Sequence, residues 1–267
     1  MRFTKMHGIG NDFILVDGFR QTVDDPAGLA LRLCPRHFGV GADGLILALP
    51  SGRADARMRI FNSDGSEAEM CGNGIRCLGR FLIDEGLCGE GPMAIETAGG
   101  TRALRFGSDG VTVDMGAPCF EPARIPVAAD SNRVALSCEG RDIAFFCVSM
   151  GNPHAVTFDL FPEDEAFRRL GAALERHPAF PNRANIEFCR ARAGGADVKV
   201  WERGDGPTLA CGTGACAVLA AGASLGLLPR EADVRLPGGS LRIRWAEDDH
   251  LYMTGPAETV YRGEVDV

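Results

Sequence analysis

The chain has 267 residues, of which 28 are basic and 36 acidic, giving a formal net charge of −8. Apolar residues make up 45 % and charged residues 24 %, a composition that predicts a folded globular protein and excludes a disordered one. The acidic balance argues against nucleic acid or a membrane surface as a partner, because both require a basic face. The longest apolar stretch, residues 215–228, is interrupted and too short to span a bilayer, and the N-terminus has no apolar signal core. We therefore expect a cytoplasmic protein.

Runs of alternating or β-branched residues predict strands along the whole chain. They cover residues 13–17, 57–62, 111–115, 144–149, 185–190, 198–202 and 241–245. Two glycine pairs, Gly99-Gly100 and Gly238-Gly239, predict the turns of hairpins over residues 94–106 and 234–245.

Two helices are predicted, each directly after a Cys-Gly-x-Gly motif. The first has apolar residues at helical spacing and is expected to end at Gly86. Its charged residues Arg76, Arg80 and Asp84 are expected to form a stripe that faces solvent. The second covers about residues 215–225 and is apolar nearly all round, which predicts a helix buried on every side.

Short motifs recur at an offset of 139 to 141 residues, always in the same order. Asp64-Gly65 recurs as Asp205-Gly206, and Cys71-Gly-Asn-Gly74 recurs as Cys211-Gly-Thr-Gly214. This recurrence predicts a duplicated domain.

The predicted fold is α+β. It consists of two pseudo-symmetric domains, each an antiparallel β-sheet curled around a central helix, with an active-site cleft between them. The N-terminal half is predicted to comprise residues 1–117 and a C-terminal tail of about 260–267, and the C-terminal half residues 118–259.

The ten cysteines include no Cys-x-x-Cys pair, so no metal site is expected. Cys71 and Cys211 differ from the others because each precedes a predicted helix, where the helix dipole lowers a thiol pKa from about 8.5 toward neutrality. Two such thiols on opposite sides of one cleft can invert an α-carbon. One thiolate removes the α-proton, and the opposing thiol delivers a proton to the other face. The chain has only two lysines, Lys5 and Lys199, which makes a Schiff-base mechanism less attractive.

Six motifs carry a resemblance to a known family, and they extend in order over essentially the whole chain. They are Met6-His-Gly-Ile-Gly-Asn-Asp-Phe13, Phe61-Asn-Ser-Asp-Gly-Ser66, Cys71-Gly-Asn-Gly74, Gly151-Asn-Pro-His154, Trp201-Glu-Arg-Gly204 and Cys211-Gly-Thr-Gly-Ala-Cys216. With these motifs the sequence resembles the diaminopimelate epimerases.

The resemblance implies a cofactor-independent isomerase that interconverts LL- and meso-diaminopimelate in lysine and peptidoglycan precursor synthesis. Cys71 and Cys211 match the catalytic acid and base. His154 and Glu202 match positions that modulate the thiol pKa. The positions that match substrate-binding residues are Asn11, Asn62, Gly72, Asn73, Asn152, Asn185, Glu202, Arg203, Gly212 and Thr213. The resemblance also implies a homodimer, with Tyr261 near the contact.

Some of these positions have a chemistry that fits the substrate. Asparagine can accept from an ammonium group and donate to a carboxylate, and Arg203 can bind a distal carboxylate bidentately. One position departs from the family, since Gly44 stands where members often have glutamine. We expect Gly44 to remove one polar contact and leave room at the distal end.

Three other interpretations remain open on the sequence. The first is a racemase of the same fold that acts on another amino acid, such as proline, histidine or glutamate. The second is a metal or iron–sulfur protein that uses Cys71, Cys77, Cys211 and Cys216, although their spacing differs from known patterns. The third is a catalytically silent binding module.

Overall fold

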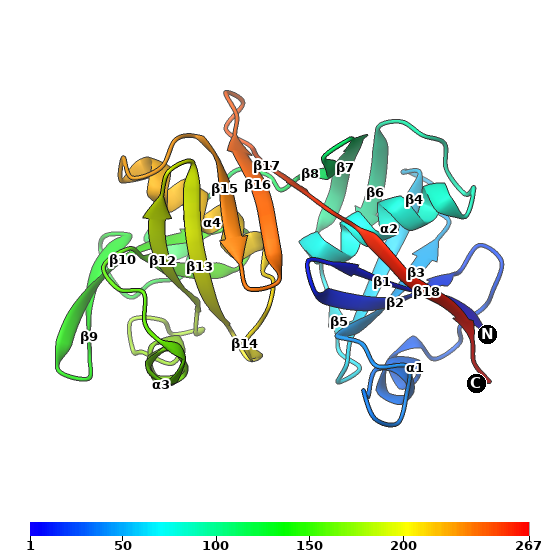
Figure 1. Cartoon of the computed structure of the whole chain (residues 1–267), viewed down its shortest axis with the longest axis horizontal. Helices are drawn as coiled ribbons and strands as arrows, with labels where there is room; N and C mark the ends of the chain where they lie inside the picture. Colours follow the sequence, from blue (N-terminus) through cyan, green and yellow to red (C-terminus); the bar gives the residue numbers. More distant parts are fainter. Residues whose placement is uncertain (267) are drawn as a thin grey trace. The chain divides into compact units, whose positions relative to one another are not determined.

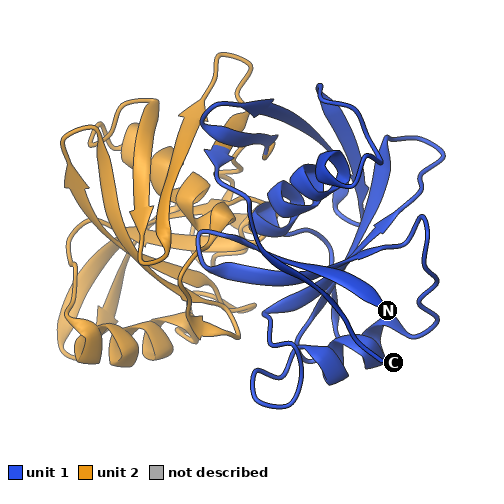
Figure 2. Cartoon of the chain, turned by 45° about the vertical axis from the view of Figure 1, so that its right-hand side comes forward, with its two compact units in different colours: residues 1–114, 254–267 blue, residues 115–253 orange. Residues whose placement is uncertain are grey.

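The computed structural model describes residues 1–266 and divides the chain into two compact units. Unit 1 consists of residues 1–114 and 254–267, and unit 2 of residues 115–253 (Figure 2).

Unit 1 contains two helices, and its strands pair with one another in a sheet (Figure 1). Its elements are β1 (Arg2–Gly8), β2 (Asn11–Asp17), α1 (Pro26–Leu33), β3 (Gly44–Leu49), β4 (Ala56–Asn62), β5 (Glu67–Ala68), α2 (Gly72–Asp84), β6 (Met93–Thr97), β7 (Gly100–Gly107), β8 (Gly110–Asp114) and β18 (Glu258–Glu264).

Unit 2 begins with a short 3-10 helix and one additional strand, and then repeats the succession of strands and helices found from β1 to β8. Its elements are η1 (Pro122–Arg124), β9 (Arg133–Cys138), β10 (Arg141–Ser149), β11 (Pro153–Thr157), α3 (Asp164–Glu175), β12 (Asn185–Arg192), β13 (Gly195–Glu202), β14 (Gly206–Pro207), α4 (Gly212–Ser224), β15 (Glu231–Leu236) and β16 (Gly239–Trp245). Strand β17 (Leu251–Gly255) crosses the boundary between the units.

The two units also share their strand pairing. In unit 1, β1 is antiparallel to β2, β2 parallel to β3, β3 antiparallel to β4, β4 parallel to β6, and β6 antiparallel to β7. Unit 2 repeats this order with β10, β11, β12, β13, β15 and β16. The predicted α+β class and pseudo-symmetry are confirmed. The prediction of purely antiparallel sheets was wrong, because each unit contains two parallel pairs.

Each parallel pair needs a crossover that returns the chain to the same end of the sheet, and helices provide it. The connection from β2 to β3 contains α1, and the connection from β4 to β6 contains α2. In unit 2 the corresponding connections contain α3 and α4. Helices α1 and α3 were missed in the sequence, although Asp25-Pro26 is a typical helix start and the Asp25 side chain accepts a hydrogen bond from the Gly28 N–H.

The two predicted helices are present, but each begins three residues earlier than expected, directly after its motif cysteine. Helix α4 is buried over nearly its whole length and contacts six strands, from β10 to β16 (Figure 1). Its small residues allow this close approach, since a Cβ added at Gly214 would lie only 3.0 Å from the Glu187 Oε1 on β12. Helix α2 ends at Asp84, and Gly86 follows it with φ +65°, as the predicted stop requires.

Arg76 contradicts the predicted solvent-facing stripe of α2. Its side chain is fully buried and donates hydrogen bonds to the carbonyl oxygens of Gly72 and Pro256, at 3.1 and 3.2 Å. Arg80 and Asp84 do form an ion pair at the surface, with an N···O distance of 2.8 Å. Arg76 is therefore part of the packing between α2 and the segment before β18.

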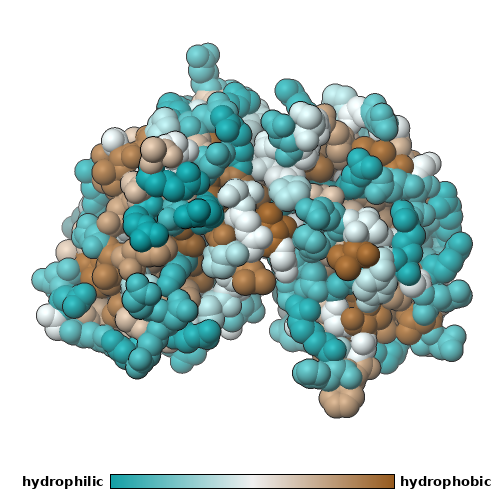
Figure 3. All heavy atoms as spheres, in the orientation of Figure 1, coloured by the Kyte–Doolittle hydropathy of each residue, from teal (hydrophilic) through white to brown (hydrophobic). Residues whose placement is uncertain are grey.

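Within residues 1–266 we find no helix that is both long and apolar enough to cross a membrane. On the face drawn in Figure 3, hydrophilic side chains are interspersed with apolar ones over both units.

Candidate functional site

The two Cys-Gly-x-Gly motifs form the same local structure in the two units. Cys71 caps the N-terminus of α2, and Cys211 caps that of α4, both with extended backbone dihedrals. Each sulfur accepts a hydrogen bond from the backbone N–H three residues later, that of Gly74 or Gly214, at 3.4 Å. Sulfur thus occupies the position in which serine or aspartate usually caps a helix, where the helix dipole favours an anion. At both positions the helix dipole and the capping N–H group act to favour the thiolate.

In unit 1 the Cys71 thiol lies beside two of the predicted asparagines. The Asn11 Oδ1 atom accepts hydrogen bonds from the Cys71 Sγ at 3.7 Å and from the Asn73 Nδ2 at 3.1 Å. The Asn11 Nδ2 donates to Asp43 at 2.8 Å, and Asp43 is paired with Arg36 at 2.7 Å. Asp43, which was not predicted, therefore fixes which end of the Asn11 amide faces the thiol.

In unit 2 the Cys211 thiol is almost completely buried and is surrounded by both donors and acceptors. Its Sγ lies 3.6 Å from the Thr213 hydroxyl oxygen. Burial raises the pKa of the Cys211 thiol well above its usual range, and the carboxylates of Glu202 and Glu187 raise it further. The hydrogen bonds from Thr213 and from the Gly214 N–H act in the opposite direction.

Glu202 adjoins this thiol, as the resemblance implies for a residue that modulates it. Burial raises the pKa of the Glu202 carboxyl, whereas hydrogen bonds from Thr208 and Cys211 lower it. The Thr208 hydroxyl donates to the Glu202 Oε1 at 2.6 Å. Because Glu202 accepts from the thiol, it favours the protonated form of Cys211.

His154 is fully buried and lies in a chain of hydrogen bonds. Its Nδ1 is 2.6 Å from the Glu187 Oε1, and its Nε2 is 2.9 Å from the Asn152 Oδ1. The Asn152 Nδ2 in turn lies 3.4 Å from the Thr213 hydroxyl oxygen. Three predicted residues are thus connected to each other, and Glu187 is the one that sequence reasoning missed. The available signal was a charged residue between two apolar ones, Ile186 and Phe188, in the predicted strand 185–190.

Asn185 and Arg203 meet at the ends of β12 and β13. The buried Asn185 side chain donates to the Pro153 carbonyl oxygen and accepts from the Arg203 N–H, both at 2.8 Å. The Arg203 guanidinium donates to the carbonyl oxygen of Asn182 at 3.3 Å. Asn185 therefore fixes the loop that carries Arg203.

Asn62 and Gly44 face each other across the start of β3 and the end of β4. The Asn62 side chain is exposed and donates to the Ser66 hydroxyl at 3.0 Å, within its own turn. The expectation that Gly44 leaves room was wrong. A Cβ at Gly44 would lie 2.7 Å from the Phe61 carbonyl oxygen, so glycine here permits the close approach of two strands.

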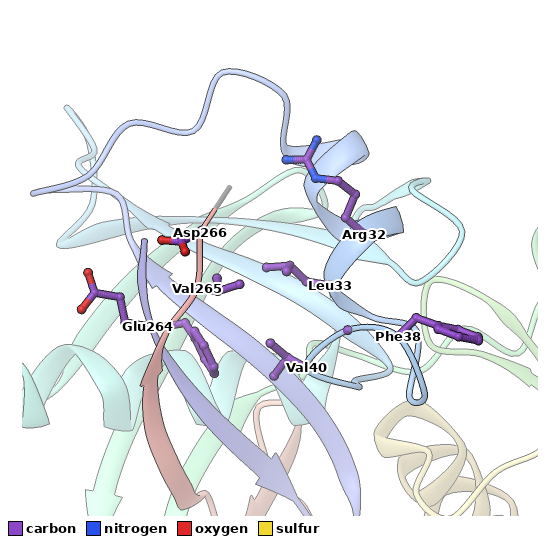
Figure 4. A pocket seen from close by; sticks show the side chains of 9 residues that line it. Arg32, Leu33, Phe38, Val40, Glu264, Val265 and Asp266 are labelled. Carbon is purple, nitrogen blue, oxygen red and sulfur yellow. The ribbon is translucent and has the colours of Figure 1, made fainter.

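A hollow of unit 1 lies away from these residues. It has a volume of about 450 Å³ and lies between α1 and the end of β18. Figure 4 shows Leu33, Val40 and Val265 pointing toward one another there. Over residues 1–266 no group of three or more His, Cys, Asp or Glu side chains is arranged to hold a metal ion. None of the ten cysteines, all of which lie within residues 1–266, forms a disulfide.

Comparisons with known proteins agree with the motif arrangement. The family model for diaminopimelate epimerase matches residues 3–121 and 146–260. The chain is 48 % identical to a diaminopimelate epimerase of Acetivibrio thermocellus, covering 100 % of this chain and 99 % of the relative. It is 50 % identical to a diaminopimelate epimerase of Desulforudis audaxviator, covering 99 % of both chains.

Solved structures share the fold at lower sequence identity. A PhzF-family phenazine biosynthesis protein of Bacillus anthracis superposes with a TM-score of 0.71 at 19 % identity, covering 100 % of this chain and 99 % of that one. The family-model match over most of the chain and the identities near 50 % establish the relationship. This chain is a member of the diaminopimelate epimerase family.

Proposed function

We propose that this protein interconverts LL- and meso-diaminopimelate without a cofactor, using Cys71 and Cys211 as a thiolate and thiol pair. The observation that carries the proposal is that two units with the same topology each place a thiol at the N-cap of the central helix. The names of the relatives, which are about half identical over the full length, support the substrate.

The reaction requires one proton to leave the α-carbon and another to arrive on the opposite face. A thiolate takes the first proton and becomes a thiol, while the second thiol gives up its proton and becomes a thiolate. Backbone N–H groups of Gly72, Asn73, Gly212 and Thr213 would bind the adjacent carboxylate. Negative charge that develops on that carboxylate is stabilised by these donors and by the two helix dipoles.

The surroundings of Cys211 support different starting protonation states for the two cysteines in the free protein. Burial beside Glu202 favours the protonated form of Cys211, which therefore begins as the proton donor. To act as the base, Cys71 must lose its proton and with it the hydrogen bond to the Asn11 Oδ1. This assignment fits the reaction, which requires one of the two cysteines to be protonated and the other deprotonated. After one turnover the two cysteines have exchanged protonation states, and reaction in the opposite direction starts from that state.

Recognition of the second amino-acid end of the substrate is assigned to the asparagines and Arg203. Asn11, Asn62, Asn152 and Asn185 offer amide donors and acceptors, and Arg203 offers a bidentate donor for the distal carboxylate. We further propose that the protein is a cytoplasmic homodimer. Tyr261, which is 43 % exposed on β18, is available for a contact between copies.

A substrate panel tests the proposal. The purified protein is incubated without added cofactor with LL-diaminopimelate and, separately, with L-proline, L-histidine and L-glutamate, and the stereoisomers are separated by chiral chromatography. We expect only diaminopimelate to be converted, to a mixture of the LL and meso forms. Preferential racemisation of one of the other amino acids would assign the protein to another substrate.

Asp43 provides a prediction on the unit 1 side of the site. Replacing it with alanine removes the acceptor that orients Asn11, so kcat is expected to fall about tenfold, the effect of one lost hydrogen bond to a charged group. Glu67→Ala is the matched control, because Glu67 forms an ion pair with Arg59 in the same unit and is similarly exposed. Equal activity of both variants in the epimerisation assay would show that Asp43 has no such role.

A further inference from the structure

The starting observation is a buried carboxylate in unit 2 that the proposed mechanism does not use. Glu187 on β12 is fully buried, and its Oε1 is 2.6 Å from the His154 Nδ1. Its other oxygen, Oε2, is buried without a hydrogen-bond partner among the described residues. Burying a carboxyl group with one oxygen unsatisfied costs stability, so its presence calls for an explanation.

Unit 1 shows that the fold itself does not need this carboxylate. Phe13 is the counterpart of His154, because each is paired in parallel with the first residue of the next strand. Ile46 is the counterpart of Glu187, since each is the third residue of that strand. Both unit 1 residues are buried and apolar.

The counterparts also occupy the same place beneath their central helices. A Cβ added to Gly74 in α2 would lie 2.9 Å from the Ile46 Cδ1. A Cβ added to Gly214 in α4 would lie 3.0 Å from the Glu187 Oε1 and 3.2 Å from the Cys211 Sγ. Where unit 1 has an isoleucine methyl group, unit 2 has a carboxylate directly behind the first turn that carries the thiol.

A series of hydrogen bonds connects the Glu187 carboxylate to the Cys211 thiol, and the donor and the acceptor of each bond can be assigned. The Asn152 Nδ2 donates to the Thr213 oxygen, which leaves the Thr213 hydroxyl hydrogen available for the Cys211 sulfur. The Asn152 Oδ1 must then accept from the His154 Nε2–H. With Nε2 protonated, the short contact between Nδ1 and Glu187 needs one further proton between them, so the His–Glu pair is neutral overall.

We propose that Glu187 is a positioning residue for Cys211: through His154 and Asn152 it orients the Thr213 hydroxyl as a donor to the sulfur, which stabilises the thiolate. This proposal rests on the proposed function for its catalytic consequence. The titratable groups near Glu187 are His154 on β11, Cys147 on β10, Cys189 on β12 and Cys211 at α4, and Glu202 on β13 faces Cys211. Burial raises the pKa of both Cys147 and Cys189, so these two remain thiols.

Two substitutions of Glu187 distinguish positioning from packing. In Glu187→Gln, the amide can donate to the His154 Nδ1 and keep Nε2 protonated, so kcat and Cys211 reactivity should stay close to wild type. Glu187→Ile introduces the residue type that unit 1 has at the corresponding position. The His154 Nδ1 then loses its hydrogen-bond partner, and the donor and acceptor roles along the series of hydrogen bonds are no longer fixed. We expect kcat to fall about tenfold with KM nearly unchanged, and the alkylation rate of Cys211 by iodoacetamide at pH 8 to fall by about the same factor.

The alkylation is followed for each cysteine by mass spectrometry, with Cys71 as the internal reference. Asp197→Asn is the matched control, because Asp197 is a buried carboxylate on the neighbouring strand that pairs with Arg190 and Arg235. It should leave both the alkylation rate and kcat unchanged. Equal effects of Glu187→Ile and Glu187→Gln, or normal Cys211 alkylation in Glu187→Ile, would overturn the proposal.

A double-mutant cycle with His154→Phe completes the test. His154→Phe/Glu187→Ile reproduces the apolar pair of unit 1 and is expected to fold. If Glu187 acts through His154, Glu187→Ile should have no further effect on Cys211 alkylation in the His154→Phe background, whereas additive effects would contradict the proposal. If the wild type did not convert diaminopimelate, the proposed function would fail, but the alkylation rates would still decide the role of Glu187.

Discussion

Serine in place of Cys71 or of Cys211 is expected to lower the rate of epimerisation by about 10²–10⁴-fold in each single variant, the range typical of a lost general acid or base. Serine preserves the cap on the helix N-terminus, because its hydroxyl also accepts the backbone hydrogen bond. It does not supply an anion at neutral pH, so neither proton transfer can proceed at the normal rate. The measurement is kcat for the conversion of LL- to meso-diaminopimelate, with a thermal melt to verify folding.

Helices α2 and α4 each contain a second cysteine, and these two cysteines supply matched controls. Cys77 in α2 and Cys216 in α4 are completely buried, and burial raises the pKa of Cys77 to about 12. Cys77→Ala and Cys216→Ala should retain most of the wild-type kcat, since both side chains lie inside their helices, away from the N-cap positions of Cys71 and Cys211. Loss of activity in these controls together with normal activity in Cys71→Ser or Cys211→Ser would reverse the assignment.

The largest expected effect on stability comes from Arg76→Ala. This change removes a fully buried side chain and its hydrogen bonds to the carbonyl oxygens of Gly72 and Pro256. Truncation leaves a cavity in the core of unit 1 and deprives two carbonyl groups of a donor. The free energy of unfolding is expected to fall by about 3–5 kcal/mol, measured by urea denaturation.

Arg80→Ala is the control for this change, since Arg80 lies one turn further along α2. Its guanidinium is half-exposed and pairs with Asp84 at the surface. An exposed pair of this kind contributes about 0.3–0.5 kcal/mol. Similar losses of stability in the two variants would contradict the structural role assigned to Arg76.

The features of the fold that could be predicted from the sequence depend on local chemistry. The hairpins at Gly99-Gly100 and Gly238-Gly239 follow from the turn conformations that glycine permits, and both are present between paired antiparallel strands. The parallel pairs could not be predicted in this way. Strand β2 pairs with β3 across a long connection, and no local signal in either strand specifies a partner so distant in sequence.

In the candidate site, too, the features that depend on local sequence could be predicted and those that depend on tertiary contacts could not. Motif spacing was sufficient to place Cys71 and Cys211 at helix starts, because helix initiation is local. The burial of Arg76 and Glu187 depends on tertiary partners, Pro256 for one and His154 for the other. Polarity alone assigns such residues to the surface, so the stripe predicted on α2 included Arg76 and the strand prediction passed over Glu187.

The use of two thiols on one carbon is tested most directly by the fate of solvent deuterium. LL-diaminopimelate is incubated with the protein in deuterated water, and both stereoisomers are analysed by mass spectrometry before equilibrium is reached. With separate acid and base groups, meso product should carry one deuterium at the inverted α-carbon, while the LL substrate recovered at early times remains unlabelled. Product that retains the original proton, or label that enters both α-carbons, would contradict the two-thiol mechanism.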